Sequence, residues 1–207
     1  MFKSLFLLSF LSIIGVSPAF AQGAVTAPDV LARTVTEEVL QILRSDKELQ
    51  SGNQKKAREL IETKIAPHFN FGGMTRLALG RNWSAANPEQ RKQLTAEFRA
   101  LLVQTYTASL VLFKDQKIEY RPLKMAPTDT DVIVRSLVRS SSGGEPVQVD
   151  YDMEKLDDGW KVYNVKIGGV SLVENYRSTF NTEVTKNGID GLIKTLREKN
   201  RALTQAK

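Results

Sequence analysis

The spacing of apolar residues changes twice along this chain, and this change constrains the fold more than any other feature. From about residue 28 to residue 112, apolar side chains recur every three or four positions, as they do on amphipathic helices. Over residues 113–168 the period falls to two, which is typical of strands with one buried face. The helical spacing returns at residues 169–197. Helices and strands segregated along the chain in this way predict an α+β fold.

Four antiparallel strands are predicted in the middle segment, at residues 118–125, 131–140, 147–154 and 160–167. The connections between them are rich in Gly, Pro, Asp and Ser, which favour turns. The third strand alternates between an apolar set and a polar set of side chains: Val147, Val149, Tyr151 and Met153 against Gln148, Asp150, Asp152 and Glu154. We therefore expect a curved sheet of about four strands, with helices on one face and water on the other.

The strongest helix signal follows Asn87. Asn87 can cap the helix, Pro88 suits the first helical position, and Gln90 can complete a capping box. Another helix is predicted at about residues 172–187. The glycine that follows suits a C-cap, and one more helix is predicted at residues 189–196.

The N-terminal residues predict export from the cytoplasm. They combine a positive charge at Lys3, an apolar run at residues 5–16 and the small-x-small sequence AFA, after which signal peptidase is expected to cut at Ala21. The apolar run is shorter than the roughly 20 residues that a membrane-spanning helix needs. We expect residues 1–21 to be a cleaved signal peptide and the remainder to act outside the cytoplasm.

No internal repeat, low-complexity tract or linker divides the rest of the sequence. Residues 22–207 are therefore expected to form one domain. Its helical subdomain covers about residues 22–112, its sheet residues 113–168, and its C-terminal helices residues 169–197.

Groups that could perform catalysis or bind a metal are scarce. The sequence has no Cys and a single His, His68, which excludes thiol chemistry and Cys-ligated metals and leaves little for imidazole catalysis. It has no nucleotide-binding, nucleophile-elbow or metalloprotease motif, and Ser171 lies in only a loose likeness of a nucleophile turn. We expect no enzyme, no metal and no cofactor.

The net charge of +6 does not indicate a nucleic-acid partner, because Lys and Arg are spread along the chain among acidic residues. Aromatic and aliphatic residues are instead plentiful on the predicted buried faces. They fit an ordinary core, and they equally fit a sheet and helices that enclose an apolar cavity. Three classes of function stay open on the residues alone: a carrier of an apolar ligand, an enzyme acting on an apolar substrate, and a structural adaptor with a filled core.

Several segments resemble the MlaC family of periplasmic phospholipid-binding proteins. They are IAPHFNF at residues 65–71, LGRNW at 79–83, FRALL at 98–102, GWKVYNV at 159–165 and GVSLVENYRSTF at 169–180. Their order and spacing extend the resemblance from about Ile61 to Leu196, with the last segment the most specific. The chain departs from the family pattern at Asn70 and Asn164, where Asp is usual, and at Gly168, where an acidic residue is common.

The resemblance implies an NTF2-like or cystatin-like sheet packed against a helical subdomain, with an apolar cavity that takes both acyl tails of a phospholipid. It also implies transient membrane contact and transport between an outer-membrane lipoprotein–porin complex and an inner-membrane ABC transporter with a lipid-binding ring, which maintains outer-membrane lipid asymmetry. For Arg177, a structural ion pair is favoured over a phosphate contact. The residues expected to contact the tails are Leu94, Phe98, Leu101, Leu102, Tyr106, Val147, Val149, Tyr151, Val165, Val170, Leu172, Tyr176 and Phe180.

Overall fold

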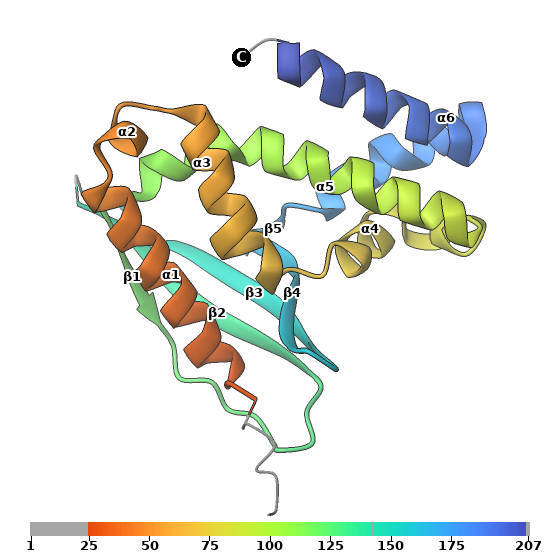
Figure 1. Cartoon of the computed structure of the whole chain (residues 1–207). Helices are drawn as coiled ribbons and strands as arrows, with labels where there is room; N and C mark the ends of the chain where they lie inside the picture. The colour runs from red at the N-terminus through yellow and green to blue at the C-terminus, as the bar shows by residue number, and fades with distance from the viewer. Residues whose placement is uncertain (1–24, 142, 206–207) are drawn as a thin grey trace, which may run out of the picture.

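The computed structural model describes residues 25–141 and 143–205, and the predicted signal peptide lies outside this part of the chain. It has the expected α+β architecture: helices cover one face of an antiparallel sheet, and further helices pack together beyond its edge (Figure 1). The elements are α1 (Pro28–Ser45), α2 (Lys47–Gln50), α3 (Gln54–Leu60), α4 (Phe71–Leu79), α5 (Pro88–Leu110), β1 (Gln116–Tyr120), β2 (Asp131–Ser140), β3 (Val147–Leu156), β4 (Gly159–Ile167), β5 (Val170–Ser171) and α6 (Arg177–Gln205).

The sheet has five strands in the order β1-β2-β3-β4-β5, and every neighbouring pair is antiparallel. Strands β2, β3 and β4 lie where the alternating pattern predicted them. The first strand ends earlier than predicted, at Tyr120, because Pro122 has no amide hydrogen with which to continue the ladder.

The fifth strand was not predicted, and it is followed by a helix that begins later than expected. Gly168 and Gly169 adopt positive φ angles of 58° and 82°, a conformation that glycine adopts readily. The chain therefore turns back, so that Val170 pairs with Ile167 and the amide of Leu172 donates to the carbonyl of Val165 at 2.8 Å. The helix predicted from residue 172 consequently begins only at Arg177.

The capping box at the start of α5 is confirmed. The side-chain oxygen of Asn87 accepts from the Gln90 amide at 2.9 Å, and that of Gln90 accepts from the Asn87 amide at 3.0 Å. The predicted break near the C-terminus is also confirmed, because Gly188 has a φ of 71° within α6. Two helical segments therefore flank Gly188, as the sequence indicates.

The helices form two distinct packing layers with different partners. Helix α1 and the C-terminal half of α5 lie over the sheet, whereas α4 and α6 pack against the N-terminal half of α5 (Figure 1). Phe98 is fully buried at the centre of this helical core, with its ring edge-on to Tyr176 and Phe180 at centroid distances of 5.1 Å. The N-terminal half of α5 therefore packs on helices, and the C-terminal half faces the sheet.

The expectation that Asp152 faces water was wrong. Its side chain is only 9% exposed and pairs with the Lys166 ammonium at 2.8 Å. The Asn164 amide donates to the same carboxylate at 2.9 Å, and the Ser171 hydroxyl donates to the Asn164 oxygen at 2.7 Å. Strand β5, which was not predicted, holds Asn164 through Ser171, and Asn164 and Lys166 leave the buried carboxylate of Asp152 paired and hydrogen-bonded.

Asn70, where the resemblance led us to expect Asp, connects helix α4 to the sheet. Asn70 caps α4 by accepting from the Gly73 amide at 2.9 Å, and its amide group donates to Glu154 at 2.8 Å. Asp could make the first of these bonds but not the second, and it would place two carboxylates together. The Asn therefore joins the start of α4 to the outer face of β3.

Candidate functional site

A cavity of about 440 Å³ lies between α5 and the inner face of the sheet. We call it the α5 chamber. Its lining is almost wholly apolar and consists of Ile61, Ile65, Ala66, Phe69, Phe71, Met74, Leu102, Val103, Tyr106, Ser109, Leu110, Phe113, Ile118, Val138, Val149, Tyr151, Val165, Ile167 and Leu172. Because the facing side chains do not fill this space, the interior is hollow here, which disfavours the adaptor with a filled core.

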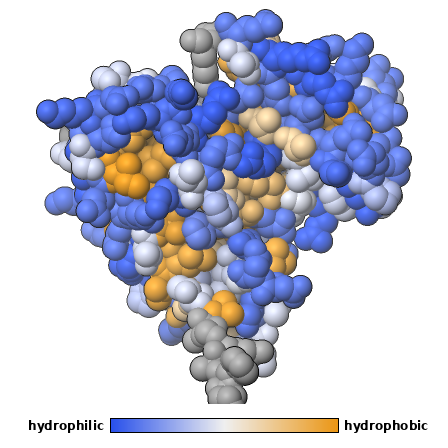
Figure 2. Space-filling view, in the orientation of Figure 1, coloured by the Kyte–Doolittle hydropathy of each residue, from blue (hydrophilic) through white to orange (hydrophobic). Residues whose placement is uncertain are grey.

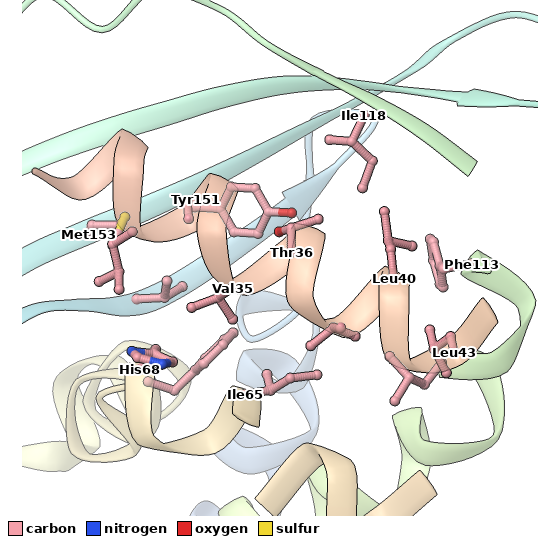
Figure 3. Close-up of a pocket in the computed structure, with 16 residues that line it drawn as sticks. Val35, Thr36, Leu40, Leu43, Ile65, His68, Phe113, Ile118, Tyr151 and Met153 are labelled. Atoms are coloured by element: carbon pink, nitrogen blue, oxygen red, sulfur yellow. The ribbon is translucent and has the colours of Figure 1, made fainter. Parts of the chain in front are cut away.

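A second cavity of about 190 Å³ lies beneath α1 (Figure 3). We call it the α1 chamber. Residues of α1 form one wall, and the opposite wall comes from the sheet and from the segment after α3. Its lining is Leu31, Ala32, Val35, Thr36, Val39, Leu40, Leu43, Ile65, His68, Phe69, Leu110, Phe113, Ile118, Tyr151, Met153 and Val162.

The two chambers adjoin each other at a common set of six side chains. We call this set the shared wall: Ile65, Phe69, Leu110, Phe113, Ile118 and Tyr151. In Figure 3 the ring of Tyr151 extends from the sheet toward α1. Tyr151 is half-buried and faces the cavity, and its burial raises the pKa of its hydroxyl.

Few polar groups face the chambers, and the hydroxyls of Thr36 and Tyr151 among them belong to one hydrogen-bonded cluster. Thr36 and Tyr120 are joined by a hydrogen bond of 2.7 Å, and the Tyr120 hydroxyl donates to the Ala32 carbonyl at 3.1 Å. The Tyr151 hydroxyl interacts with the hydroxyls of Tyr120, Ser136 and Thr36. These bonds attach α1 to the sheet, and they leave the chamber walls uncharged.

The lone histidine lies at the end of the α1 chamber. Burial, followed by the nearby charge of Lys161, holds the pKa of His68 below its usual value of 6.5. The neutral imidazole is therefore favoured near pH 7, in keeping with an apolar lining. His68 also borders a shallow surface depression that contains Asp157, Asp158 and Lys161.

The opposite end of the sheet has an exposed apolar rim, made of Leu112, Phe113, Val147, Ile167 and Val170. Phe113 and Ile167 also line the α5 chamber. The strand register puts Val147, Ile167 and Val170 at one end of the sheet. Ile167 pairs with Val170 and with Val149, which lies two residues along β3 from Val147. We take this rim as the mouth of the α5 chamber.

Apolar side chains also reach the surface elsewhere. Figure 2 shows orange side chains between hydrophilic ones over the half of the molecule that carries α1 and α3, whereas the part that carries α6 is mostly hydrophilic. This pattern fits cavities that lie beneath α1 and α5 and a solid core next to α6.

The structure divides the thirteen residues expected to contact acyl tails into three groups. Six line the α5 chamber: Leu102, Tyr106, Val149, Tyr151, Val165 and Leu172. Five others pack only in or against the helical core between α4, α5 and α6, which Leu102 and Tyr106 also contact: Leu94, Phe98, Leu101, Tyr176 and Phe180. Val147 and Val170 are exposed on the rim. The division arises because the apolar face of α5 packs on helices at its N-terminal end and faces a cavity at its C-terminal end.

Sequence reasoning missed every chamber residue contributed by α1 and by the segment after α3. The apolar repeat of α1, from Leu31 to Leu43, was visible as a helix face. A helical repeat shows that one face is buried but not whether its neighbour is protein or empty space. The clue that was available is the aromatic segment around Phe69 and Phe71, since both residues line the α5 chamber.

The possible catalytic groups have structural roles. The Ser171 hydroxyl donates to Asn164 and accepts from the Glu174 amide at 3.0 Å, so it is engaged within the outer face of the sheet. Arg177 donates to the Leu77 carbonyl at 2.9 Å and pairs with Glu174 at 2.9 Å.

Among residues 25–141 and 143–205, no group of three or more His, Cys, Asp or Glu could hold a metal ion. Within the same residues, no helix is both long and apolar enough to cross a bilayer.

A hollow, uncharged and almost wholly apolar interior beneath an antiparallel sheet defines a binding protein for an apolar ligand. Comparison with known proteins gives the family. Residues 33–198 match the family model described as MlaC protein, so this chain belongs to the MlaC family, whose members are periplasmic, non-enzymatic lipid-binding proteins.

Similar proteins include one that was solved with a ligand. A phospholipid-binding protein from Ralstonia solanacearum, in complex with a phospholipid, is 38% identical, with a TM-score of 0.78 over 86% of this chain and 99% of that one. The toluene tolerance protein ttg2D of Pseudomonas putida is 26% identical over 87% of this chain and 83% of its own length. The intermembrane phospholipid transport system binding protein MlaC of Haemophilus influenzae is 23% identical over 84% of this chain and 83% of its own length.

Proposed function

We propose that this chain is a phospholipid carrier that holds the acyl tails of a glycerophospholipid in its apolar chambers. The observation that carries the proposal is the unfilled apolar interior, which opens at a rim of exposed apolar side chains. The likeness to a protein solved in complex with a phospholipid supports the same ligand class. The six tail-contact residues proposed for the α5 chamber are Leu102, Tyr106, Val149, Tyr151, Val165 and Leu172.

The energetics of lipid transfer explain why such a carrier needs no chemistry of its own. Two ordinary acyl chains contain about 30 methylenes, and each is worth about 0.8 kcal/mol when it is kept from water. Free passage of a phospholipid through water would therefore cost on the order of 25 kcal/mol. A carrier that offers a comparably apolar interior makes the transfer nearly neutral, so the membranes and partner proteins at each end set its direction.

The charges at the His68 end of the cavity favour one orientation of the lipid. At the His68 end, the surface depression contains Asp157 and Asp158, and Lys161 already pairs with Asp158 at 2.9 Å. An anionic phosphate is disfavoured beside these carboxylates. The headgroup therefore stays in water at the rim, and the tails extend inward past Val149 and Tyr151.

The cellular role that we propose follows the family. The chain is exported, its signal peptide is cleaved after Ala21, and residues 22–207 act as one lipid-binding domain in the periplasm. There it exchanges phospholipid with an outer-membrane lipoprotein–porin complex and with an inner-membrane ABC transporter that carries a lipid-binding ring. By doing so it maintains the lipid asymmetry of the outer membrane, with only transient membrane contact.

Extraction of lipid from vesicles tests the binding function directly. The protein is stripped of lipid by unfolding and refolding, incubated with vesicles of phosphatidylethanolamine and phosphatidylglycerol, and separated from them by gel filtration. We expect diacyl phospholipid to elute with the protein in a fixed molar ratio. Refolded protein that elutes without lipid over a wide range of vesicle concentrations would contradict the proposal.

A further inference from the structure

We infer that the outer edge of strand β1 is an interaction surface for a second copy of this chain. Two copies pair their β1 strands in antiparallel fashion and so join their two sheets into one continuous sheet. The inference goes beyond the proposed function and does not depend on what the interior holds. The geometry points to it through the unpaired backbone groups along this edge and through the order of the charges on the strand.

Strand β1 lies at one edge of the sheet, where it pairs with β2 (Figure 1). The amide of Arg121 donates to the Arg135 carbonyl of β2 at 2.9 Å, so every second residue along β1 bonds to β2 and the residues between them direct their backbone groups outward. The outward residues are Gln116, Ile118 and Tyr120. Within the described part of the chain, no hydrogen bond engages the backbone groups that Ile118 and Tyr120 direct outward. Such an edge is a template for a further strand.

Helix α1 is attached to this edge without closing it. The Arg44 guanidinium donates to the Lys114 carbonyl at 2.7 Å and to the Gln116 carbonyl at 3.1 Å. A carbonyl oxygen has two lone pairs, so Gln116 can accept a second hydrogen bond from a neighbouring strand. The hydroxyls of Thr36 and Tyr120 meet at 2.7 Å on the inner face of the sheet. Helix α1 therefore lies over this face and leaves the edge accessible (Figure 1).

The charges along β1 are self-complementary. Lys117 and Glu119 flank Ile118 with opposite charges. Asp115 and Arg121, two residues farther out, repeat this opposition. All four charged side chains are exposed. In an antiparallel pair with its two-fold axis at Ile118, each basic residue therefore lies opposite an acidic residue of the other copy, which stabilises the pair.

Neighbouring registers fit less well than the one centred on Ile118. Moving the axis by one residue, to Lys117 or to Glu119, places that residue opposite its own copy and so sets two like charges together. Moving it by two residues leaves only one of the three outward residues paired within the strand. With the axis at Ile118, the backbone of Ile118 bonds to its own copy and that of Gln116 bonds to Tyr120. This register satisfies the charges and the backbone groups together.

The interface that this pairing creates is small. Strand β1 has five residues, Gln116–Tyr120, so the contacts consist of a few backbone hydrogen bonds and exposed ion pairs. Interfaces below about 1,200 Å² are typical of transient complexes, and exposed ion pairs weaken as salt is added. We therefore expect a dimer that forms at high protein concentration and dissociates on dilution or at high ionic strength.

Charge reversal on β1 tests the pairing. Lys117→Glu and Glu119→Lys each set like charges opposite one another in a homodimer, whereas a mixture of the two proteins restores opposite charges at both positions. Lys55→Glu is the matched control, because Lys55 is exposed on α3. Sedimentation velocity at concentrations up to about 1 mM measures dimerisation, since small interfaces are weak. Glu119 also pairs with Arg139 of β2 at 3.1 Å, so circular dichroism must show that each variant is folded.

We expect the wild-type and Lys55→Glu proteins to dimerise alike, and each β1 variant to dimerise at least about tenfold more weakly. The mixture of the two β1 variants should recover wild-type association. Hydrogen exchange should show that the amides of Ile118 and Tyr120 become protected as the wild-type concentration rises. The inference is overturned if the wild-type protein stays monomeric, if its dimer is insensitive to both reversals, or if the mixture associates no better than its components. Binding of another protein's strand at β1 without self-association would overturn it as well.

Discussion

Replacing Leu102 with Asp is expected to abolish lipid retention while the protein still folds. Leu102 lies on α5 at the wall of the α5 chamber and is only 5% exposed. When the chamber is empty, water can enter it and hydrate the carboxylate, so the folded state tolerates the charge. Acyl chains would expel that water and leave an unpaired charge, a penalty of several kcal/mol. Lipid occupancy should fall by about a hundredfold or more, as measured by native mass spectrometry.

Two further variants make this result specific. Ala108→Asp places the same charge on the exposed side of the same helix, and it should leave occupancy unchanged. Val149→Trp fills the chamber from the sheet side with volume instead of charge, and it should also displace lipid. Wild-type occupancy in well-folded Leu102→Asp and Val149→Trp proteins would refute the assignment of this chamber as the lipid site.

Replacing Phe98 with Ala is expected to have the opposite pattern, namely a large loss of stability without loss of lipid. Phe98 is fully buried, and it packs edge-on against Tyr176 and Phe180 in the helical core. Removing the ring should lower the free energy of unfolding by about 3–5 kcal/mol, because it leaves a cavity and deletes two aromatic contacts. Urea denaturation of lipid-free protein measures this loss, and native mass spectrometry of the folded fraction should show wild-type lipid occupancy.

Phe98→Leu keeps the experiment decisive if the Ala variant does not fold. It retains most of the buried volume, so the loss of stability should be smaller than for Ala. Phe98 lies about one turn before Leu102 on α5 and, unlike Leu102, does not line the chamber, so the comparison separates stability from lipid binding. A folded Phe98→Leu protein that has lost its lipid would show that the chamber extends farther along α5 than we describe.

Local rules predicted most of the elements. Alternation located β2, β3 and β4, and the sequence Asn87-Pro88-Glu89-Gln90 placed the start of α5 correctly, because a capping box and a half-buried strand each depend on neighbouring residues. The β5 turn was missed because Gly168 and Gly169 can equally end a strand or reverse it. The polar cluster around Asp152 was missed for a related reason, since Ser171 of β5 holds Asn164, which donates to the Asp152 carboxylate.

The cavity itself could not be predicted from the pattern of residues. Leu94 and Leu102 carry the same side chain on the same helix and both belong to the helical core, yet only Leu102 also lines a chamber. Burial periodicity is identical in the two cases, because it records only the absence of bulk water. Whether a buried face meets side chains or empty space depends on how α1, α5 and the sheet are placed in three dimensions. The family resemblance therefore supplied the ligand class, while the chamber residues required the structure.

Native mass spectrometry of the protein purified from periplasm without detergent, combined with organic extraction, tests the central claim most directly. Both chambers lie within one chain, so we expect an adduct of diacyl phospholipid mass on the folded protein, released on denaturation and recovered in the organic phase. Protein that is isolated bare, and that takes up no phospholipid from vesicles when it is properly folded, would contradict the assignment of this interior to lipid.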